Sequence, residues 1–332
     1  LLSTVIGLVF IYFGKNTAVR FNLIDYPGTA DHKNHQKPTP MIGGIVIIGT
    51  LFTVMIFNFN ILNESLIGIL LASCCVFLFG LIDDYKNLNV KSKLFGQFIA
   101  SILLLYYGVR VDFFNSPEFF IKVAPSTAYS LNIMITIIWI IGIINAFNLI
   151  DGIDGLAAGI SILSSLFFLI ISIGAYQPDI ALLCCTILGC SISIYYFNVT
   201  PAKIFLGDSG SQTLGLLFAA IAIKYNPINA NQSSTWFVPI MIFSIPIFDL
   251  LLVLFSRIRR GKKVYSASRD HTFHRLEKIG FSKERSVLTI QGVSLFLGIV
   301  GFLCINLNFI YANLVFLIFL TLGVLTFFVL DK

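Results

Sequence analysis

The sequence predicts an all-α integral membrane protein: a single domain over residues 1–332, folded as a polytopic bundle of about eleven transmembrane helices. Of the 332 residues, 57% are hydrophobic and 11% are charged, which is less than half of the roughly 25% found in soluble domains. The apolar residues also come in runs long enough to cross a hydrocarbon core of about 30 Å. This composition excludes a soluble enzyme, a secreted disulfide scaffold and a disordered chain.

Each predicted helix is an apolar run that begins or ends at polar or turn-forming residues. The opening run has no basic lead-in, so we expect a first membrane helix rather than a signal peptide. In chain order, with one bounding residue each, the runs are roughly 1–14 (before Lys15), 42–60 (after Pro40), 65–82 (before Asp83), 94–110 (after Lys93), 128–147 (before Asn148), 156–174 (after Gly155), 179–197 (before Asn198), 211–225 (after Gly210), 235–256 (before Arg257), 287–305 (after Arg285) and 309–330 (before Asp331).

The basic residues predict how the chain is oriented. If successive loops alternate sides, one side receives all 22 Lys and Arg residues except Arg110, Lys122 and Lys224. The positive-inside rule makes that side cytoplasmic, with the N-terminus outside and the C-terminus inside. The net charge of +6 therefore follows from topology and gives no reason to expect a nucleic-acid partner. The cytoplasmic loops are roughly 15–41, 83–93, 148–155, 198–210 and 257–286, and we expect them to form the active site.

The side chains capable of chemistry gather on the same side. A transporter needs polar groups near the bilayer midplane and access from both faces, whereas here they cluster at one interface. This distribution favours a multi-pass enzyme with its active site facing the cytoplasm, and a transporter is the alternative from another class. The phenylalanine-rich, low-charge composition is compatible with the bacterial inner membrane. The residues on this side are His32, His35, His271, His274, Asp83, Asp84, Asp151, Asp154 and Asp208.

Two adjacent aspartates, Asp83 and Asp84, end an apolar run within LFGLIDDYKNLNVKSKL (78–94). Adjacent carboxylates repel each other unless a cation compensates them, and acidic residues at a helix C-terminus oppose the helix dipole. The ordinary interpretation is a solvated helix end. The misfit favours instead a site where the two carboxylates meet a divalent cation or a proton.

Two glycine-rich stretches carry further carboxylates. In NAFNLIDGIDGLAAG (145–159), Asn and Asp side chains alternate with glycines that permit tight turns and close backbone approach. More polar side chains are present than a capped turn needs, so this stretch predicts a Mg²⁺ or ligand site. In KIFLGDSGSQTLG (203–215), Asp208 lies in a turn that opens a helix, where backbone N–H groups favour phosphates; alone, this pattern also fits a simple N-cap.

Two cytoplasmic loops could contact phosphate. In the loop RIRRGKKVYSASRDHTFHRLEKIG (257–280), His271 and His274 share a helix face, and Arg269 and Arg275 suit phosphate oxygens. In the first loop, Lys37 and its neighbouring turn residues could form a phosphate-contacting wall. Asp249 lies inside an apolar run, where a carboxylate is costly unless paired; we expect it to make a hydrogen bond inside the bundle.

The ordered motifs LIDDYKNL, NAFNLIDGIDGLAAG, FLGDSGS and SRDHTFHRL resemble those of the polyprenyl-phosphate N-acetylhexosamine-1-phosphate transferases, glycosyltransferase family 4. The similarity runs from Asp25 to about Leu276. It implies transfer of a sugar-1-phosphate from a UDP-N-acetylhexosamine to undecaprenyl or dolichyl phosphate, with release of UMP and a requirement for Mg²⁺ or Mn²⁺. We expect undecaprenyl phosphate, held in the lipid bilayer, as the acceptor. A homodimer is a further expectation.

The resemblance also implies roles for individual residues. Asp208 matches the principal metal ligand, with Asn148 as a second. Asp83 and Asp84 match the aspartate pair near the lipid phosphate, where one of them deprotonates or positions the acceptor. Asp154 matches the residue that reads the uracil ring, beside Asp151 and Gly152. Similar in placement to residues that hold the phosphates and the sugar are Lys93, Arg269, His271, His274 and Arg275.

Two departures bear on the donor sugar. Phe273 replaces a histidine common in the GlcNAc-type pattern, and Met41 stands where many GlcNAc-type relatives have Arg. The run of three histidines followed by Phe-Glu, usual in the MurNAc-pentapeptide branch, is absent. We therefore expect UDP-GlcNAc as the donor and a product that initiates a cell-envelope polysaccharide. The alternatives are another UDP-N-acetyl sugar and UDP-MurNAc-pentapeptide.

Overall fold

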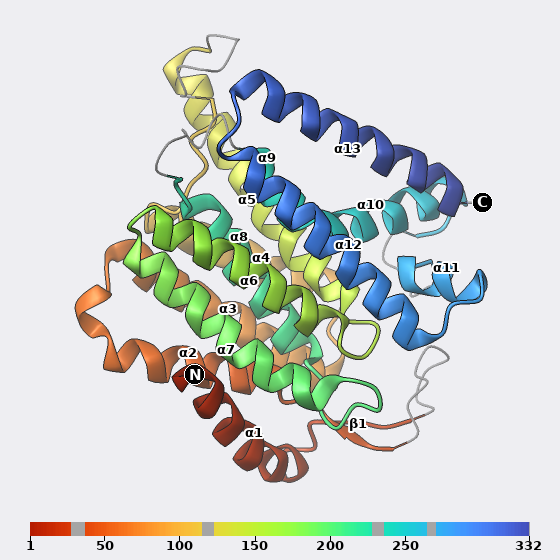
Figure 1. Ribbon diagram of the computed structural model, residues 1–332. Helices are drawn as coiled ribbons and strands as arrows, with labels where there is room; N and C mark the ends of the chain where they lie inside the picture. The colour runs from red at the N-terminus through yellow and green to blue at the C-terminus, as the bar shows by residue number, and fades with distance from the viewer. Residues whose placement is uncertain (28–36, 115–122, 228–235, 264–269, 332) are drawn as a thin grey trace.

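The computed structural model describes residues 1–27, 37–114, 123–227, 236–263 and 270–331. This part of the chain is a bundle of α-helices with one short sheet (Figure 1). The helices are α1 (Leu2–Arg20), α2 (Gly43–Phe57), α3 (Glu64–Lys86), α4 (Val90–Tyr106), α5 (Pro125–Ile150), α6 (Leu156–Gly174), α7 (Pro178–Asn198), α8 (Gly207–Lys224), α9 (Phe237–Ile242), α10 (Ser244–Arg259), α11 (Thr272–Lys278), α12 (Lys283–Cys304) and α13 (Phe309–Leu330), with a 3₁₀ turn η1 at Phe59–Ile61.

Every predicted apolar run coincides with a helix, and one run is divided between two. The run at 235–256 forms α9 and α10 because Pro246 has no N–H to bond to the carbonyl of Ile242, the residue at which α9 ends. In the described part of the chain, seven helices are long and apolar enough to cross a membrane: α1, α3, α5, α6, α7, α12 and α13. The prediction of an all-α polytopic membrane protein is therefore confirmed. The count of eleven crossings and the sides of the termini stay predictions.

A two-stranded sheet was not expected from the sequence. Strand β1 (Ile24–Asp25) pairs antiparallel with β2 (Thr39–Pro40), and Met41 bridges in parallel to Phe205, just before α8. These contacts fasten the first polar loop to the start of α8. Strands of two residues show no alternation of polar and apolar side chains, so periodicity cannot reveal them.

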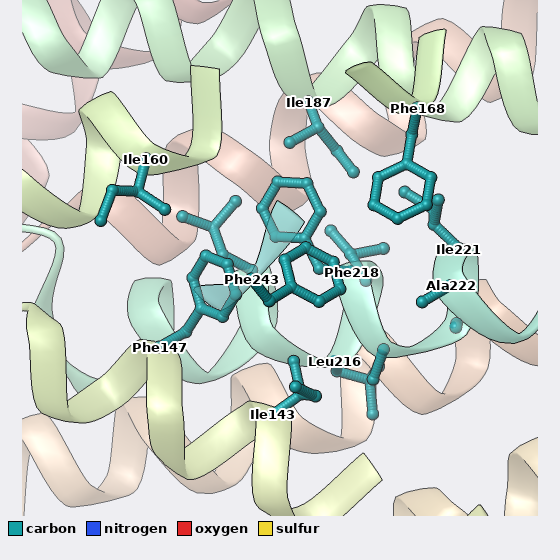
Figure 2. Close-up of a cluster of buried hydrophobic side chains, with 14 of the residues drawn as sticks. Ile143, Phe147, Ile160, Phe168, Ile187, Leu216, Phe218, Ile221, Ala222 and Phe243 are labelled. Atoms are coloured by element: carbon teal, nitrogen blue, oxygen red, sulfur yellow. The ribbon is translucent and has the colours of Figure 1, made fainter. Parts of the chain in front are cut away.

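Helix α8 is the centre of the bundle. Its residues from Ser209 to Ile223 are all buried, and it packs against α2, α3 and α5. Around it lies an aromatic cluster (Figure 2), in which the ring of Phe147 stacks on that of Phe218 at 4.9 Å between centroids, and Phe243 lies 5.6 Å from Phe218. Because close-packed rings of this kind leave little freedom for movement, the polar N-terminus of α8 has a fixed position.

Helix α13 contrasts with α8. Only Ala312 is buried along its length, and it lies beside α12 at the edge of the bundle (Figure 1). Its C-terminal end approaches α10 and α11, where Leu330 and Asp331 accept hydrogen bonds from arginines. This end anchors a helix that otherwise has few contacts with the described residues.

Candidate active site

Asp84 joins the end of α3 to the start of α8. Its Oδ1 accepts a hydrogen bond from the backbone N–H of Asp208 at 2.7 Å, and its Oδ2 accepts from the N–H and Oγ of Ser209 at 3.1 and 2.6 Å. An acceptor at this place satisfies N–H groups that have no partner inside the helix, and its negative charge favours the positive end of the helix dipole. Asp84 therefore holds Asp208 in position, and its predicted catalytic role stays a prediction.

Gly207 makes this junction possible. Its φ of +71° lies in the left-handed region that favours glycine. A Cβ at this position would lie 2.7 Å from Oδ2 of Asp84, so any larger residue would push the capping carboxylate away. The glycine before Asp208 is therefore required by both its conformation and its neighbour.

Asp208 lies at the convergence of α4, α5 and α8. Its Oδ2 contacts Nζ of Lys93 at 2.7 Å, and its Oδ1 accepts from Nδ2 of Asn148 at 2.8 Å. Lys93 also contacts the carboxylate of Asp83, which accepts the N–H of Leu88 at 2.7 Å. The structure thus brings together four predicted site residues that lie far apart in the sequence.

The charges of this cluster perturb one another. Burial works against the ammonium form of Lys93, yet Asp208 and Asp83 raise its pKa. Burial likewise works against the Asp208 carboxylate, but hydrogen bonds to Asp83, Lys93 and Asn148 hold its pKa below the ordinary value. Burial and the neighbouring carboxylates of Asp208, Asp84 and Asp154 raise the pKa of Asp151 well above its ordinary value. Burial and mutual repulsion therefore oppose the simultaneous ionisation of these carboxyl groups in the free protein.

The turn between α5 and α6 carries Asp151, Gly152 and Asp154. Oδ2 of Asp154 accepts from the N–H of Ala202 at 3.2 Å. The backbone of Gly155 is held from two sides, by Oδ1 of Asn198 at 3.0 Å and by Nε2 of Gln291 at 3.0 Å. These bonds fix the turn beside the Asp208 cluster.

Helix α11 reaches this turn through Phe273, which is 3% exposed. A Cβ placed on Gly152 would lie 3.0 Å from Cζ of Phe273, so the ring packs against the glycine backbone. The Phe273 ring also lies 4.2 Å from that of His274 and is parallel to that of His271, with centroids 5.5 Å apart. The residue that departs from the family pattern therefore docks the histidine segment onto the aspartate turn.

The two histidines have acidic partners. Nδ1 of His271 lies 2.8 Å from Oδ2 of Asp249, and Nδ1 of His274 lies 3.1 Å from Oε2 of Glu277. The expectation that Asp249 is hydrogen-bonded inside the bundle is confirmed.

Arg275 has a different environment from the one the resemblance implies. Its guanidinium group, in a side chain 7% exposed, pairs with Asp331 at 3.3 Å and donates to the carbonyl of Leu330 and to Oγ of Ser256. Its Nε donates to the carbonyl of Asp270 at 2.9 Å. These contacts occupy the guanidinium and fasten α11 to the end of α13. The phosphate-binding role of Arg275 stays a prediction.

Of two other predicted contacts, one is not brought into the cluster and one lies outside the described residues. The side chain of Lys37 is exposed, and the one contact described for this residue is its carbonyl oxygen accepting from Oγ1 of Thr39. Arg269 lies outside the described residues, so its role stays a prediction.

The sequence analysis missed a buried chain of amides beneath the carboxylates. Nδ2 of Asn145 donates to Oε1 of Gln97 at 2.8 Å, and Nε2 of Gln97 donates to Oε1 of Gln212 at 3.2 Å. Gln97 and Gln212 follow Lys93 and Asp208 by four residues, and Asn145 precedes Asn148 by three. Since residues three or four apart share a helix face, this spacing could have placed the amides one turn deeper.

The residues fit Mg²⁺ with substrate present. Among the described residues, no three His, Cys, Asp or Glu side chains converge to hold a metal ion by themselves. Mg²⁺ commonly takes one or two carboxylates and completes its shell with waters and substrate phosphates. Asp208 supplies a carboxylate, and Asn148, whose Nδ2 donates to Asp208 and Ser211, has its Oδ1 left as a ligand. A divalent cation would favour the ionised forms of these crowded carboxyl groups.

Comparison with known proteins agrees with these features. The glycosyl transferase family 4 model matches residues 66–226, which include the acidic cluster. A decaprenyl-phosphate N-acetylglucosaminephosphotransferase of Mycobacterium leprae is 31% identical over 313 residues, covering 86% of this chain and 77% of the relative. A probable undecaprenyl-phosphate N-acetylglucosaminyl 1-phosphate transferase of Bacillus subtilis is 28% identical over 282 residues, covering 83% and 75%.

A relative named for another donor has the same identity to this chain. The phospho-N-acetylmuramoyl-pentapeptide-transferase of Bacillus cereus is 31% identical over 285 residues, covering 81% of this chain and 85% of the relative. Identity therefore does not separate the GlcNAc-type from the MurNAc-type relatives, although all of them are polyprenyl-phosphate or phospho-sugar transferases. With the family model, the coverage of these relatives and the acidic cluster in agreement, the chain belongs to glycosyl transferase family 4, the polyprenyl-phosphate N-acetylhexosamine-1-phosphate transferases.

Proposed function

We propose that this protein transfers GlcNAc-1-phosphate from UDP-GlcNAc to undecaprenyl phosphate in the bacterial cytoplasmic membrane, with the active site facing the cytoplasm. UMP is released, and the lipid-linked diphosphate sugar initiates a cell-envelope polysaccharide. The names of the Mycobacterium leprae and Bacillus subtilis relatives support this donor. The name of the Bacillus cereus relative supports UDP-MurNAc-pentapeptide as the alternative donor for the same reaction.

The observation that carries the proposal is the position of Asp208. It lies at the N-terminus of the most buried helix, held by Asp84 from α3, by Lys93 from α4 and by Asn148 from α5. Because the Asp84 carboxylate already occupies the first N–H groups of this helix, it is Lys93 that offers a positive charge to phosphate oxygens. Phosphoryl transfer depends on placing charged groups and neutralising their charge more than on a strong base. The cluster provides such placement.

The bond changes balance without a further reactant. A phosphate oxygen of the lipid acceptor forms a bond to the sugar-linked phosphorus of the donor, and the bond from that phosphorus to the bridging oxygen breaks. The electron pair leaves with UMP. Asp208 and Asn148 would hold Mg²⁺, which supplies positive charge to the diphosphate when bound. Lys93 binds phosphate oxygens, Asp83 orients Lys93, and the turn with Asp151 and Asp154 receives the nucleoside.

The test uses the purified chain in detergent with undecaprenyl phosphate and UDP-GlcNAc, following UMP. We expect release that requires both the lipid and Mg²⁺ and stops with a chelator. Asp208→Asn abolishes it, whereas the matched control Asp112→Asn, at an exposed aspartate paired with Arg110, retains the wild-type rate. Wild-type turnover by Asp208→Asn would refute the assigned site.

A donor panel separates the alternatives. Release of UMP from UDP-MurNAc-pentapeptide or from another UDP-N-acetyl sugar, but not from UDP-GlcNAc, would keep the reaction and change the donor. Movement of a substrate across vesicles without UMP would indicate a transporter.

A further inference from the structure

The side chain of Asp249 is buried in α10 and makes three hydrogen bonds to one short segment. It is 2% exposed. Its Oδ1 accepts from the backbone N–H of Thr272 at 2.6 Å and from Oγ1 of Thr272 at 2.7 Å, while its Oδ2 lies 2.8 Å from Nδ1 of His271. A carboxylate inside an apolar helix is costly, and these contacts use both of its oxygens at the start of α11.

This arrangement determines which nitrogen of His271 carries a proton. A carboxylate only accepts hydrogen bonds, so Nδ1 of His271 must be the donor. In the neutral imidazole, Nε2 is then the unprotonated nitrogen. Within the described ranges, Nε2 has no hydrogen-bond partner, and the His271 side chain is 12% exposed. It is therefore Nε2 that remains for a ligand.

His271 is next to the proposed substrate site. Its ring is parallel to that of Phe273, and Phe273 packs against Gly152 in the turn with Asp151 and Asp154. Charged groups of this corner within the described ranges include Arg257, which interacts with Asp270 and Asp249, and Arg260, which pairs with Asp270 at 2.5 Å. The hydrogen bonds of Asp249 go to the histidine segment, however, and not to these arginines.

We propose that Asp249 is a positioning residue that fixes the tautomer of His271, so that Nε2 faces the donor diphosphate and, when protonated, donates a hydrogen bond to a phosphate oxygen of the departing UMP. This proposal rests on the proposed function for the identity of the phosphate. The tautomer itself does not depend on it. A purely structural role would instead have Asp249 hold α10 to α11 without any effect on His271 chemistry.

Asp249→Asn distinguishes the two roles. The N–H and Oγ1–H of Thr272 both need an acceptor, so the new amide oxygen stays with Thr272 and its NH₂ faces Nδ1. An amide in this position imposes the opposite tautomer on histidine, with little change of shape. We expect ¹⁵N NMR of histidine-labelled protein to show Nδ1–H in the wild type and Nε2–H in Asp249→Asn. His271→Gln identifies the signal among the four histidines.

The kinetic counterpart is a double-mutant cycle. If Asp249 acts through His271, Asp249→Asn lowers kcat for UMP release by roughly 10²-fold with little change in KM, and has no further effect in a His271→Ala background. If Asp249→Asn lowered kcat equally in the wild-type and the His271→Ala backgrounds, the proposal would be overturned. A wild-type ¹⁵N spectrum that places the proton of the neutral His271 ring on Nε2 would also overturn the proposal. This outcome can be read whether or not UMP release is detected.

Thr272→Val is the matched control. It removes the hydroxyl donor to Asp249 but leaves the backbone N–H and the His271 contact. We expect an unchanged tautomer and wild-type turnover. A loss as large as that of Asp249→Asn, with the tautomer unchanged, would mean that packing of this corner sets activity, and would overturn the proposal even if Asp249→Asn failed to fold.

Discussion

The ammonium nitrogen of Lys93 lies 2.7 Å from Oδ2 of Asp208 and also contacts the carboxylate of Asp83. One cation on α4 thus compensates carboxylates from α3 and α8, at the place where the proposal puts a divalent ion and the donor diphosphate. The divalent ion and the diphosphate bring their own charges to this place. The charge balance that Lys93 maintains in the free protein is therefore coupled to substrate binding.

Lys93→Gln tests this link. Without the ammonium group, the carboxylates repel each other, and we expect the free energy of unfolding to fall by about 1–3 kcal/mol because the pair is only partly screened by water. Adding Mg²⁺ should recover part of the lost Tm, and more than it gives the wild type. Thermal unfolding with chelator and with Mg²⁺ measures both. Lys86→Gln, at an exposed lysine of α3, is the control; an equal response there would refute the local explanation.

Gly152→Ala tests the contact between the aspartate turn and α11. The new Cβ would lie 3.0 Å from Cζ of Phe273, and overpacking typically costs 1–3 kcal/mol. We expect UMP release to fall at least about tenfold as α11 shifts, with recovery in the double variant Gly152→Ala/Phe273→Leu. Gly174→Ala is the control because its Cβ meets nothing within 4 Å. No rescue by Phe273→Leu would argue against the contact.

Asp331→Ala tests the anchor of α13. The variant leaves the guanidinium of Arg275 buried without this carboxylate, a change that typically costs about 3–5 kcal/mol. Asp112→Ala breaks the exposed pair with Arg110 and should cost about 1 kcal/mol or less. Chemical denaturation measures the free energy of unfolding of both variants. Similar decreases in this free energy would contradict a buried ion pair between Asp331 and Arg275.

Asp151 predicts the pH dependence of stability in the absence of divalent ions. Its pKa is raised in the folded protein by burial and by Asp208, Asp84 and Asp154, so the folded state binds more protons than the unfolded state. Stability is therefore fully present below the ordinary carboxyl pKa of 3.8 and falls as the pH rises towards the folded-state pKa. Asp151→Asn should flatten this decline in Tm between pH 4 and 8; an unchanged slope would exclude Asp151 as its source.

The helices could be predicted from the sequence because apolar runs report burial in a membrane directly. The carboxylates could be predicted because Asp83 and Asp208 lie in motifs at the ends of such runs. The partners of these groups could not be predicted in the same way. That Asp84 caps α8, or that Arg275 pairs with Asp331, depends on how helices distant in the sequence meet, and a single sequence has no periodic signal for such contacts.

The chain of amides is a set of contacts that residue spacing in the sequence could have predicted. Gln97 and Gln212 are each 2% exposed and stand one helical turn from Lys93 and Asp208, so their spacing could have placed them beneath the cluster. Asp249 was recognisable as a costly carboxylate, but its partner His271 lies 22 residues away across a stretch that includes residues outside the described ranges. The contact between Asp249 and His271 could therefore be recognised only in the folded structure.

The burial of Asp331 against Arg275 has a consequence for biosynthesis. The segment with His271 and Phe273 is translated before α13, yet one of its fastenings is at residues 330 and 331. A nascent chain that has not yet inserted α13 therefore lacks a contact that fixes the histidines against the aspartate turn. Catalytic competence should arrive late, when the last helix has entered the bilayer, so that incomplete chains do not consume the lipid carrier.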